Sequence, residues 1–128
     1  QKEVADRICA GPGGRVYGIT SVLTQAWYTC EPLFTVEPGS FIPPPKVRSA
    51  VIRMKRHNTE PTDLNADLLF RVVKAAFNQR RKTLGNALKT FTPLARVPER
   101  YAKLRAEQLS VEDFIALTWA CGQGPKEG

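Results

Sequence analysis

Two strand-like runs limit what this chain can fold into more than any other feature. They cover residues 29–36 and 49–56, and in the second run alternate positions are apolar. Two strands bury too little apolar surface to form a sheet that is stable by itself. We therefore expect them to belong to a larger α/β sheet whose partner strands are supplied by sequence upstream of residue 1.

The link between the two runs contains three consecutive prolines, Pro43, Pro44 and Pro45, shortly after Phe41. Each proline fixes its own φ and restricts the backbone of the residue before it. This pattern predicts a stiff, extended connection.

Helical periodicity surrounds the strands. Before them, apolar spacing predicts helices over residues 2–10 and 17–27. A polar stretch at residues 57–65 is typical of a linker, and only helices are predicted after it. The expected fold class is an α/β fragment, residues 1–58, followed by a small all-α domain, residues 59–128.

The first helices expected after the linker are defined by apolar stripes and a cap. Residues 66–77 place Phe70, Val73 and Phe77 on one stripe. A second helix, with Asn78 as its N-cap, carries Leu84 and Leu88. Gly85 falls at an exposed-looking position of that helix, where it costs about 1 kcal/mol relative to alanine.

Two more helices are expected towards the end of the chain. A short one covers residues 99–104. The last one is marked by Ser110 with Asp113 three residues later, the pattern of a capping box, ahead of an apolar run.

The net charge of +7 is concentrated in two blocks. Residues 38–59 contain five cations and no acid, and residues 68–98 contain seven cations and no acid, whereas the rest of the chain has seven cations and twelve acids. Such blocks suit a polyanion, because each phosphate contact releases condensed counterions. A solvated basic face is the alternative that charge alone leaves open.

Several common kinds of site are not indicated. Cys9, Cys30 and Cys121 are far apart and lack the spacing of a disulfide framework or a zinc site, so we expect reduced, packed thiols and no metal. His57, the only histidine, has no cysteine or carboxylate pattern around it. Reduced thiols are typical of a cytoplasmic protein, which is the location expected here. No apolar run is long enough to cross a bilayer, so no membrane partner is expected.

The glycine-rich segment at residues 11–14 follows a predicted helix, and Pro12 removes one backbone donor. A loop that cradles phosphate follows a strand and opens a helix. We therefore interpret this segment as a helix stop.

Four separated motifs carry a resemblance to a known family. They are Gln1-Lys2-Glu3-Val4-Ala5, Tyr17-Gly18-x-x-Ser21-Val22, Phe41-x-Pro-x-Pro-Lys46-Val47-x-Ser49-Ala50-Val51 and Phe77-Asn78-Gln79-Arg80-Arg81-Lys82-Thr83-Leu84. In order and approximate spacing they resemble the rRNA adenine N6,N6-dimethyltransferase family.

The resemblance implies a fold and an activity. The family has a Rossmann-like class I methyltransferase domain that binds S-adenosylmethionine, followed by a small helical domain. Its members dimethylate two adjacent adenosines near the 3′ end of small-subunit rRNA during ribosome maturation. The family's methyl-donor loop, acidic ribose-binding residue and Asn-Leu-Pro-Tyr motif all come before the part that matches this chain. We therefore expect a C-terminal fragment that is inactive by itself but binds RNA.

The partner that the resemblance implies is small-subunit rRNA or the immature 30S subunit. The intact protein is expected to be a monomer, whereas the fragment could self-associate through its unpaired strands.

The resemblance also assigns roles to residues. Phe41 is expected to stack on the target adenine, the alternative being a place in the core beside the strands. The run Arg80-Arg81-Lys82, expected at a helix start, is the candidate clamp on the rRNA backbone, with Arg81 and Lys82 as contacts and Arg80 partly structural. Four further cations could widen this surface: Lys46, Arg71, Lys74 and Lys89.

Two rival functions stay open at this point. One is a relative that methylates an adenosine of large-subunit rRNA and confers antibiotic resistance. The motif around Arg80 argues against it. The other is a non-catalytic RNA-binding or ribosome-assembly module.

Overall fold

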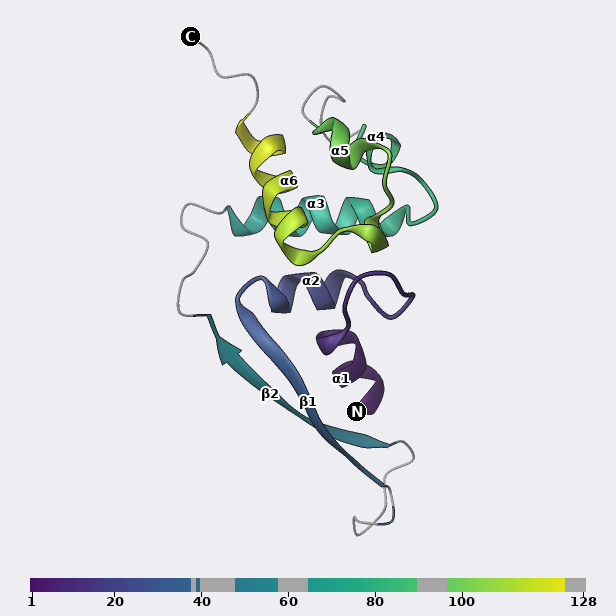
Figure 1. The fold of residues 1–128 in the computed structure, drawn as a ribbon, viewed down its shortest axis with the longest axis vertical. Helices are drawn as coiled ribbons and strands as arrows, with labels where there is room; N and C mark the ends of the chain where they lie inside the picture. Colours follow the sequence, from purple (N-terminus) through teal and green to yellow (C-terminus); the bar gives the residue numbers. More distant parts are fainter. Residues whose placement is uncertain (38, 40–47, 58–64, 90–96, 124–128) are drawn as a thin grey trace.

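The computed structural model describes residues 1–37, 39, 48–57, 65–89 and 97–123. Helices α1 (Lys2–Cys9) and α2 (Ile19–Gln25) precede strands β1 (Tyr28–Val36) and β2 (Ser49–Arg56). The helices that follow are α3 (Ala66–Asn78), α4 (Leu84–Ala87), α5 (Glu99–Ala102), the 3-10 helix η3 (Ala106–Gln108) and α6 (Val111–Gln123). The expected order of helices and strands is confirmed. Figure 1 shows the sheet and α1 at one end, α3 to α6 at the other, and α2 between them.

Strands β1 and β2 form a two-stranded antiparallel sheet. Cys30 pairs with Met54 and Phe34 with Val51, and the register shifts between Pro32 and Phe34. No residue within these two strands is buried, and Phe34 is 59% exposed. The sheet therefore buries little apolar surface, and its place in a larger sheet stays a prediction.

The hydrophobic core lies among α2, α3 and α6. The rings of Tyr17 and Phe77 meet edge to face with centroids 5.8 Å apart, and Phe77 packs on Phe114 at 5.5 Å. The Tyr17 hydroxyl donates a hydrogen bond of 2.7 Å to the Leu109 carbonyl, which satisfies a buried polar group. This core contains residues from before and after residue 58. It therefore does not mark a boundary at that residue, and the predicted division of the chain there stays a prediction.

Helix α3 begins at a side-chain cap, because the Asn65 side chain accepts a hydrogen bond from the Leu68 N–H. The residues it buries recur at helical spacing: Leu69, Val72, Val73, Ala76 and Phe77. The prediction that Phe70 shares the buried stripe is wrong. Phe70 lies about 100° around the helix from Leu69 and is 43% exposed.

The predicted helix start at Asn78 is also wrong. Asn78 is the last residue of α3, and the Lys82 N–H donates to the Gln79 carbonyl to close a turn. Helix α4 begins only at Leu84, with Thr83 at its N-cap position. Arg80, Arg81 and Lys82 therefore lie in a turn, where successive side chains are not held at helical angles.

The same short helix corrects a second expectation. Gly85, expected to be exposed, is buried next to Leu84. Leu84 and Leu88 are both fully buried, as their spacing predicts.

The capping box of the last helix is confirmed. The Asp113 N–H donates to the Ser110 hydroxyl, and the Ser110 N–H donates to the Asp113 carboxylate, both at 3.1 Å. The Tyr101 hydroxyl also donates to Asp113. Burial raises the pKa of this carboxyl, but the hydrogen bonds from Ser110 and Tyr101 outweigh it and leave the pKa below its usual range.

Candidate nucleic-acid interface

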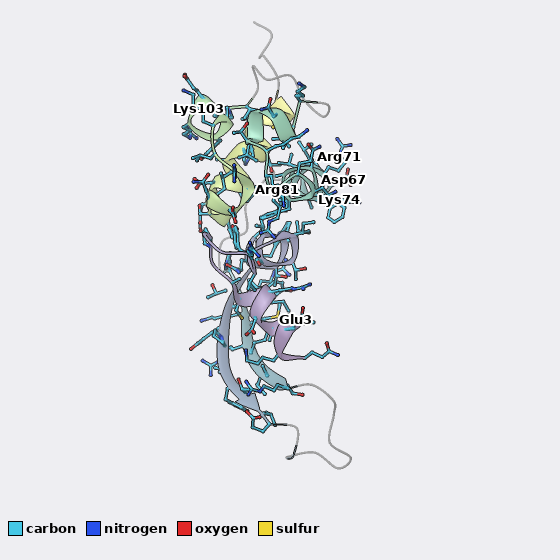
Figure 2. The ribbon with its side chains drawn as sticks, turned by 90° about the vertical axis from the view of Figure 1, so that its right-hand side faces the viewer. Glu3, Asp67, Arg71, Lys74, Arg81 and Lys103 are labelled. Atoms are coloured by element: carbon cyan, nitrogen blue, oxygen red, sulfur yellow. The ribbon has the colours of Figure 1, made fainter. Side chains whose placement is uncertain are left out.

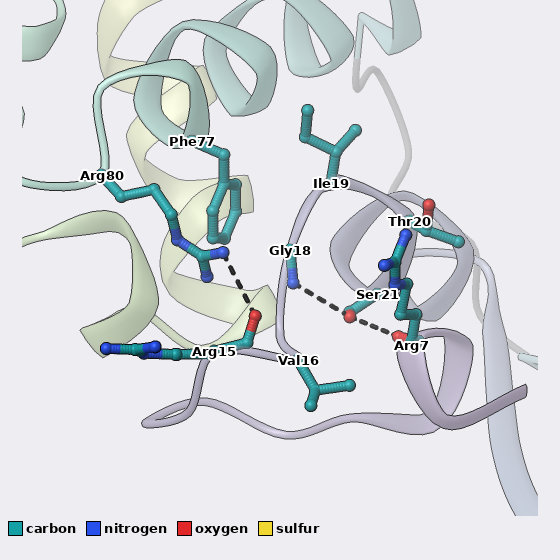
Figure 3. Close-up of a pocket in the computed structure, with 9 residues that line it drawn as sticks. All are labelled: Arg7, Arg15, Val16, Gly18, Ile19, Thr20, Ser21, Phe77 and Arg80. Atoms are coloured by element: carbon teal, nitrogen blue, oxygen red, sulfur yellow. Dashed lines mark hydrogen bonds between the residues drawn. The ribbon is translucent and has the colours of Figure 1, made fainter. Parts of the chain in front are cut away.

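Arg80 fixes the turn after α3 to the loop between α1 and α2. Its guanidinium donates to the Arg15 carbonyl at 3.2 Å and lies over the Phe77 ring at 5.2 Å from the centroid (Figure 3). It also donates to the Tyr17 carbonyl at 2.5 Å. The hydrogen bond to Tyr17 is partly buried, where a carbonyl needs a donor. Arg80 therefore has the structural part expected of it.

A cleft of about 430 Å³ opens beside this anchor. Four arginines and one acid line it: Arg15, Arg80, Arg81, Arg105 and Glu107. We refer to it as the arginine cleft. Its two walls are tied together because the Gly13 N–H donates a 2.7 Å hydrogen bond to the Glu107 carbonyl. Gly13 has a φ of +104°, a conformation that favours glycine.

The arginine cleft has a strong excess of positive charge. Arg15, Arg81 and Arg105 are exposed, and none of them forms an ion pair with any residue that the structure describes. Guanidinium groups held close together repel one another, and the one carboxylate of Glu107 does not balance four of them, so an anion placed between them is stabilised.

Arg81 also faces a second hollow, of about 400 Å³, whose lining includes Asn78, Gln79 and Lys82. The turn therefore presents Arg81 to both hollows and Lys82 to one of them. This placement brings together the three residues of the predicted clamp.

A third hollow, of about 380 Å³, shares Arg15 and Arg80 with the arginine cleft and reaches Arg7 (Figure 3). Here the buried Ser21 hydroxyl accepts a hydrogen bond from the Gly18 N–H and donates one to the Arg7 carbonyl. The Arg7 side chain pairs with Glu3 at 2.7 Å. Its charge is therefore partly compensated, unlike the charges of the arginine cleft.

Other predicted cations lie away from the arginine cleft. Arg71 and Lys74 project from the outer face of α3 (Figure 2), and Lys89 follows α4. Phe41 and Lys46 fall outside the described residues.

Sequence reasoning missed Arg15 and Arg105. Arg105 lies in a segment where acids balance the cations, so a count of charge along the chain does not single it out. Contacts between distant segments, among them the hydrogen bonds of Gly13 and Arg80, bring both residues beside Arg81.

Three further features of the structure concern metal sites, membrane spans and cysteines. Among the described residues, no group of three or more histidine, cysteine or acidic side chains could hold a metal. No helix in the described ranges has both the length and the apolar character to cross a bilayer. All three cysteines are free thiols, and burial raises the pKa of Cys9 and Cys30.

The sequence matches known proteins over nearly all of its length. The family model for ribosomal RNA adenine dimethylase matches residues 1–118. Ribosomal RNA small subunit methyltransferase A of Bacteroides thetaiotaomicron is 55% identical over 122 residues, which is 92% of this chain and 45% of that protein. The Flavobacterium johnsoniae protein of the same name is 53% identical over 119 residues, 92% of this chain and 46% of that protein. The chain thus spans about half the length of the curated relatives that it matches.

Solved structures agree on the fold. A dimethyladenosine transferase from Plasmodium falciparum superposes with a TM-score of 0.77 at 23% identity, covering 91% of this chain and 53% of that one. The 23S rRNA methyltransferase ErmE superposes with a TM-score of 0.66 at 21% identity, covering 96% of this chain and 52% of that one. Both support the α/β methyltransferase fold. Since the family model covers residues 1–118, the chain belongs to the ribosomal RNA adenine dimethylase family.

Proposed function

We propose that this chain is the C-terminal portion of a small-subunit rRNA adenine N6,N6-dimethyltransferase and supplies part of its grip on rRNA. The observation that carries the proposal is the arginine cleft, in which Arg15, Arg81 and Arg105 meet without ion-pair partners in the described part of the chain. Planar guanidinium groups bind phosphate oxygens through paired, charge-assisted hydrogen bonds. A surface of this kind recognises the shape and backbone of folded RNA.

The reaction proposed for the whole protein is the dimethylation of two adjacent adenosines near the 3′ end of the rRNA in the immature 30S subunit. An adenine inside a stack cannot offer its N6 amino group, so it must be turned out and held flat. Phe41 is the residue proposed to hold it, with Lys46 near a phosphate of the same loop. Arg71, Lys74, Arg80, Lys82 and Lys89 are proposed to support Arg81 in binding the rRNA backbone.

The methyl donor is S-adenosylmethionine, which supplies the methyl group when it is bound. The glycine-rich segment of this chain does not fit a donor site, because Gly11 comes after α1 and the loop leads to α2 without an intervening strand. The donor is therefore assigned to residues other than those described here, and the chain alone is proposed to be inactive.

Sequence identity to known relatives favours the small-subunit proposal over the large-subunit alternative. Relatives at 50–55% identity are named small subunit methyltransferases, whereas ErmE is similar at 21% identity and supports the fold alone. We also propose a cytoplasmic location, in keeping with an rRNA substrate.

Binding of an rRNA hairpin tests the role of the arginine cleft. We expect the affinity of the chain to fall steeply with salt, and the double variant Arg81→Ala/Lys82→Ala to flatten the slope of log K against log salt by about 1.5. The matched control, Arg48→Ala/Arg53→Ala, removes the same charge where the structure shows ion pairs to Glu37 and Glu31. If both double variants lost the same affinity and the same salt dependence, the cleft would bind RNA no differently from any other basic surface of the chain.

Methyl transfer tests the activity of the whole protein. We expect the intact protein, given S-adenosylmethionine and small subunits with unmethylated rRNA, to form N6,N6-dimethyladenosine at two adjacent positions, detected by mass spectrometry. Tight rRNA binding without any methylated product would favour the non-catalytic assembly module.

A further inference from the structure

The outer face of α3 carries an aromatic ring that the core does not use. Phe70 is 43% exposed, although Leu69, Val72 and Val73 on the buried face of the same helix are fully packed. Because that face anchors the helix, the Phe70 ring is held on a rigid element. An aromatic side chain presented this way is available to a ligand with a flat apolar surface.

A cation accompanies the ring. Lys74 lies one helical turn further on, and its Nζ is 5.8 Å from the Phe70 ring centroid, within the range of a cation–π contact. Arg71, also exposed, projects from the same side of α3, as Figure 2 shows together with Asp67. Asp67 lies in the first turn of the helix, where the helix dipole stabilises an acid. From residue 68 to residue 98 no further acid occurs.

This face is continuous with the surface that is proposed to bind rRNA. Phe70, Lys74 and Asn78 follow each other at intervals of four residues, so they lie along one side of α3. Asn78 in turn lines the hollow that contains Arg81 and Lys82. An RNA strand that contacts Arg81 could therefore continue along α3 to Phe70.

Phe34 on β1 shows what is special about this arrangement. It is also an exposed phenylalanine, at 59%, but it belongs to a two-stranded sheet in which no residue is buried. The ring of Phe70 instead sits among cations on a packed helix. Aromatic rings with neighbouring cations are the usual means of binding unpaired nucleotides, because the ring stacks on a base and the cations attract the backbone.

We propose that Phe70 is a stacking platform for an unpaired RNA base, with Lys74 attracting an adjacent phosphate. This inference rests on the proposed function in that its ligand is RNA, but it concerns a site separate from the arginine cleft. The residue touches the base and takes no part in methyl transfer.

Fluorescence of a labelled RNA tests the inference in the full 128-residue chain. The probe is a short adenosine-rich single strand that contains 2-aminopurine, and a duplex of the same length serves for comparison. We expect the chain to quench 2-aminopurine through stacking. Phe70→Ala should abolish the quenching and weaken single-strand binding by about five- to tenfold, while duplex binding changes by less than about twofold.

Further variants separate stacking from charge and from burial. Phe70→Trp should restore quenching, whereas Phe70→Leu, which is apolar without a π face, should behave like Phe70→Ala. For single-strand binding, Lys74→Ala should flatten the slope of log K against log salt by about 0.7. Phe70→Ala should leave this slope unchanged. Phe34→Ala is the matched control and should leave quenching and affinity unchanged.

The outcomes distinguish this inference from the proposed function. If the wild-type chain binds no RNA, both are overturned. If RNA binding depends on Arg81 while Phe70→Leu quenches and binds like the wild type, only the stacking platform is overturned. Phe70→Ala could also lose binding to intact small subunits while its binding to naked RNA is unchanged. That result would assign the ring to a protein partner and would likewise overturn the stacking platform.

Discussion

The helical region of this chain, around α2, α3 and α6, buries many side chains, whereas its two-stranded sheet buries none. Around α2, α3 and α6, side chains such as Leu69, Phe114 and Leu117 are fully buried. In β1 and β2 no side chain is buried, and Phe34 and Met54 stay exposed. The difference teaches where this chain holds its own structure. The helical region contains the buried core and positions the arginine cleft, whereas the sheet, which contacts α1 and α2, buries none of its own residues.

The largest expected effect comes from truncating the core. Phe114→Ala should lower the free energy of unfolding by about 3–5 kcal/mol, because it removes a fully buried ring that packs on Phe77. Phe34→Ala, which removes the same side chain from the sheet, should change it by less than about 1 kcal/mol. Chemical denaturation of both variants measures the difference. Similar losses would mean that the sheet is packed as tightly as the core.

The next effect separates two neighbouring arginines. Arg80→Ala should destabilise the fold by about 1–3 kcal/mol, because it leaves the partly buried Tyr17 carbonyl without its donor. Arg81→Ala should change stability by less than about 0.5 kcal/mol but weaken RNA binding, since its side chain is exposed. Thermal unfolding and RNA titration of the two variants, run side by side, check this. Equal stability losses would contradict the division of roles.

These comparisons also show what the sequence could predict. The order of helices and strands and the capping box of Ser110 follow from local patterns, and the structure confirms them. The turn at Arg80 does not follow, because α3 continues through Asn78, a residue that is equally suited to beginning a helix. Phe70 is an apolar residue that periodicity assigned to the core, and its exposure depends on which side of α3 meets α2 and α6.

The arginine cleft could be predicted only in part. The run from Arg80 to Lys82 is visible as a motif, whereas Arg15 and Arg105 join it through contacts between distant segments. No count of charge along the chain contains that information.

A smaller effect concerns the cap of α6. Ser110→Ala should cost about 1 kcal/mol, because the N–H of Asp113 loses its acceptor. Urea unfolding at neutral pH measures this cost. A stability equal to that of the wild type would mean that solvent replaces the cap.

The smallest effect is the pH dependence of the same cap. The pKa of Asp113 is lower in the folded chain than its ordinary value, so the folded state binds this proton less readily than the unfolded chain. Its stabilisation is full above the ordinary carboxyl pKa of about 4 and is lost as the pH falls through the folded value. The stability difference between wild type and Asp113→Asn should therefore shrink in acid, as urea unfolding over a pH series would show. A constant difference would contradict it.

Hydrogen exchange of the chain with and without rRNA hairpin tests the central claim most directly, because it reads both regions in one experiment. Without RNA, the amides of α3 and α6 should be well protected and those of β1 and β2 weakly protected. On adding RNA, new protection should appear at the turn of residues 79–83 and around Arg15 and Arg105, with none at residues 28–33 or 51–56. New protection in the strands, with the turn at residues 79–83 unchanged, would contradict the assignment of the RNA grip to the helical region.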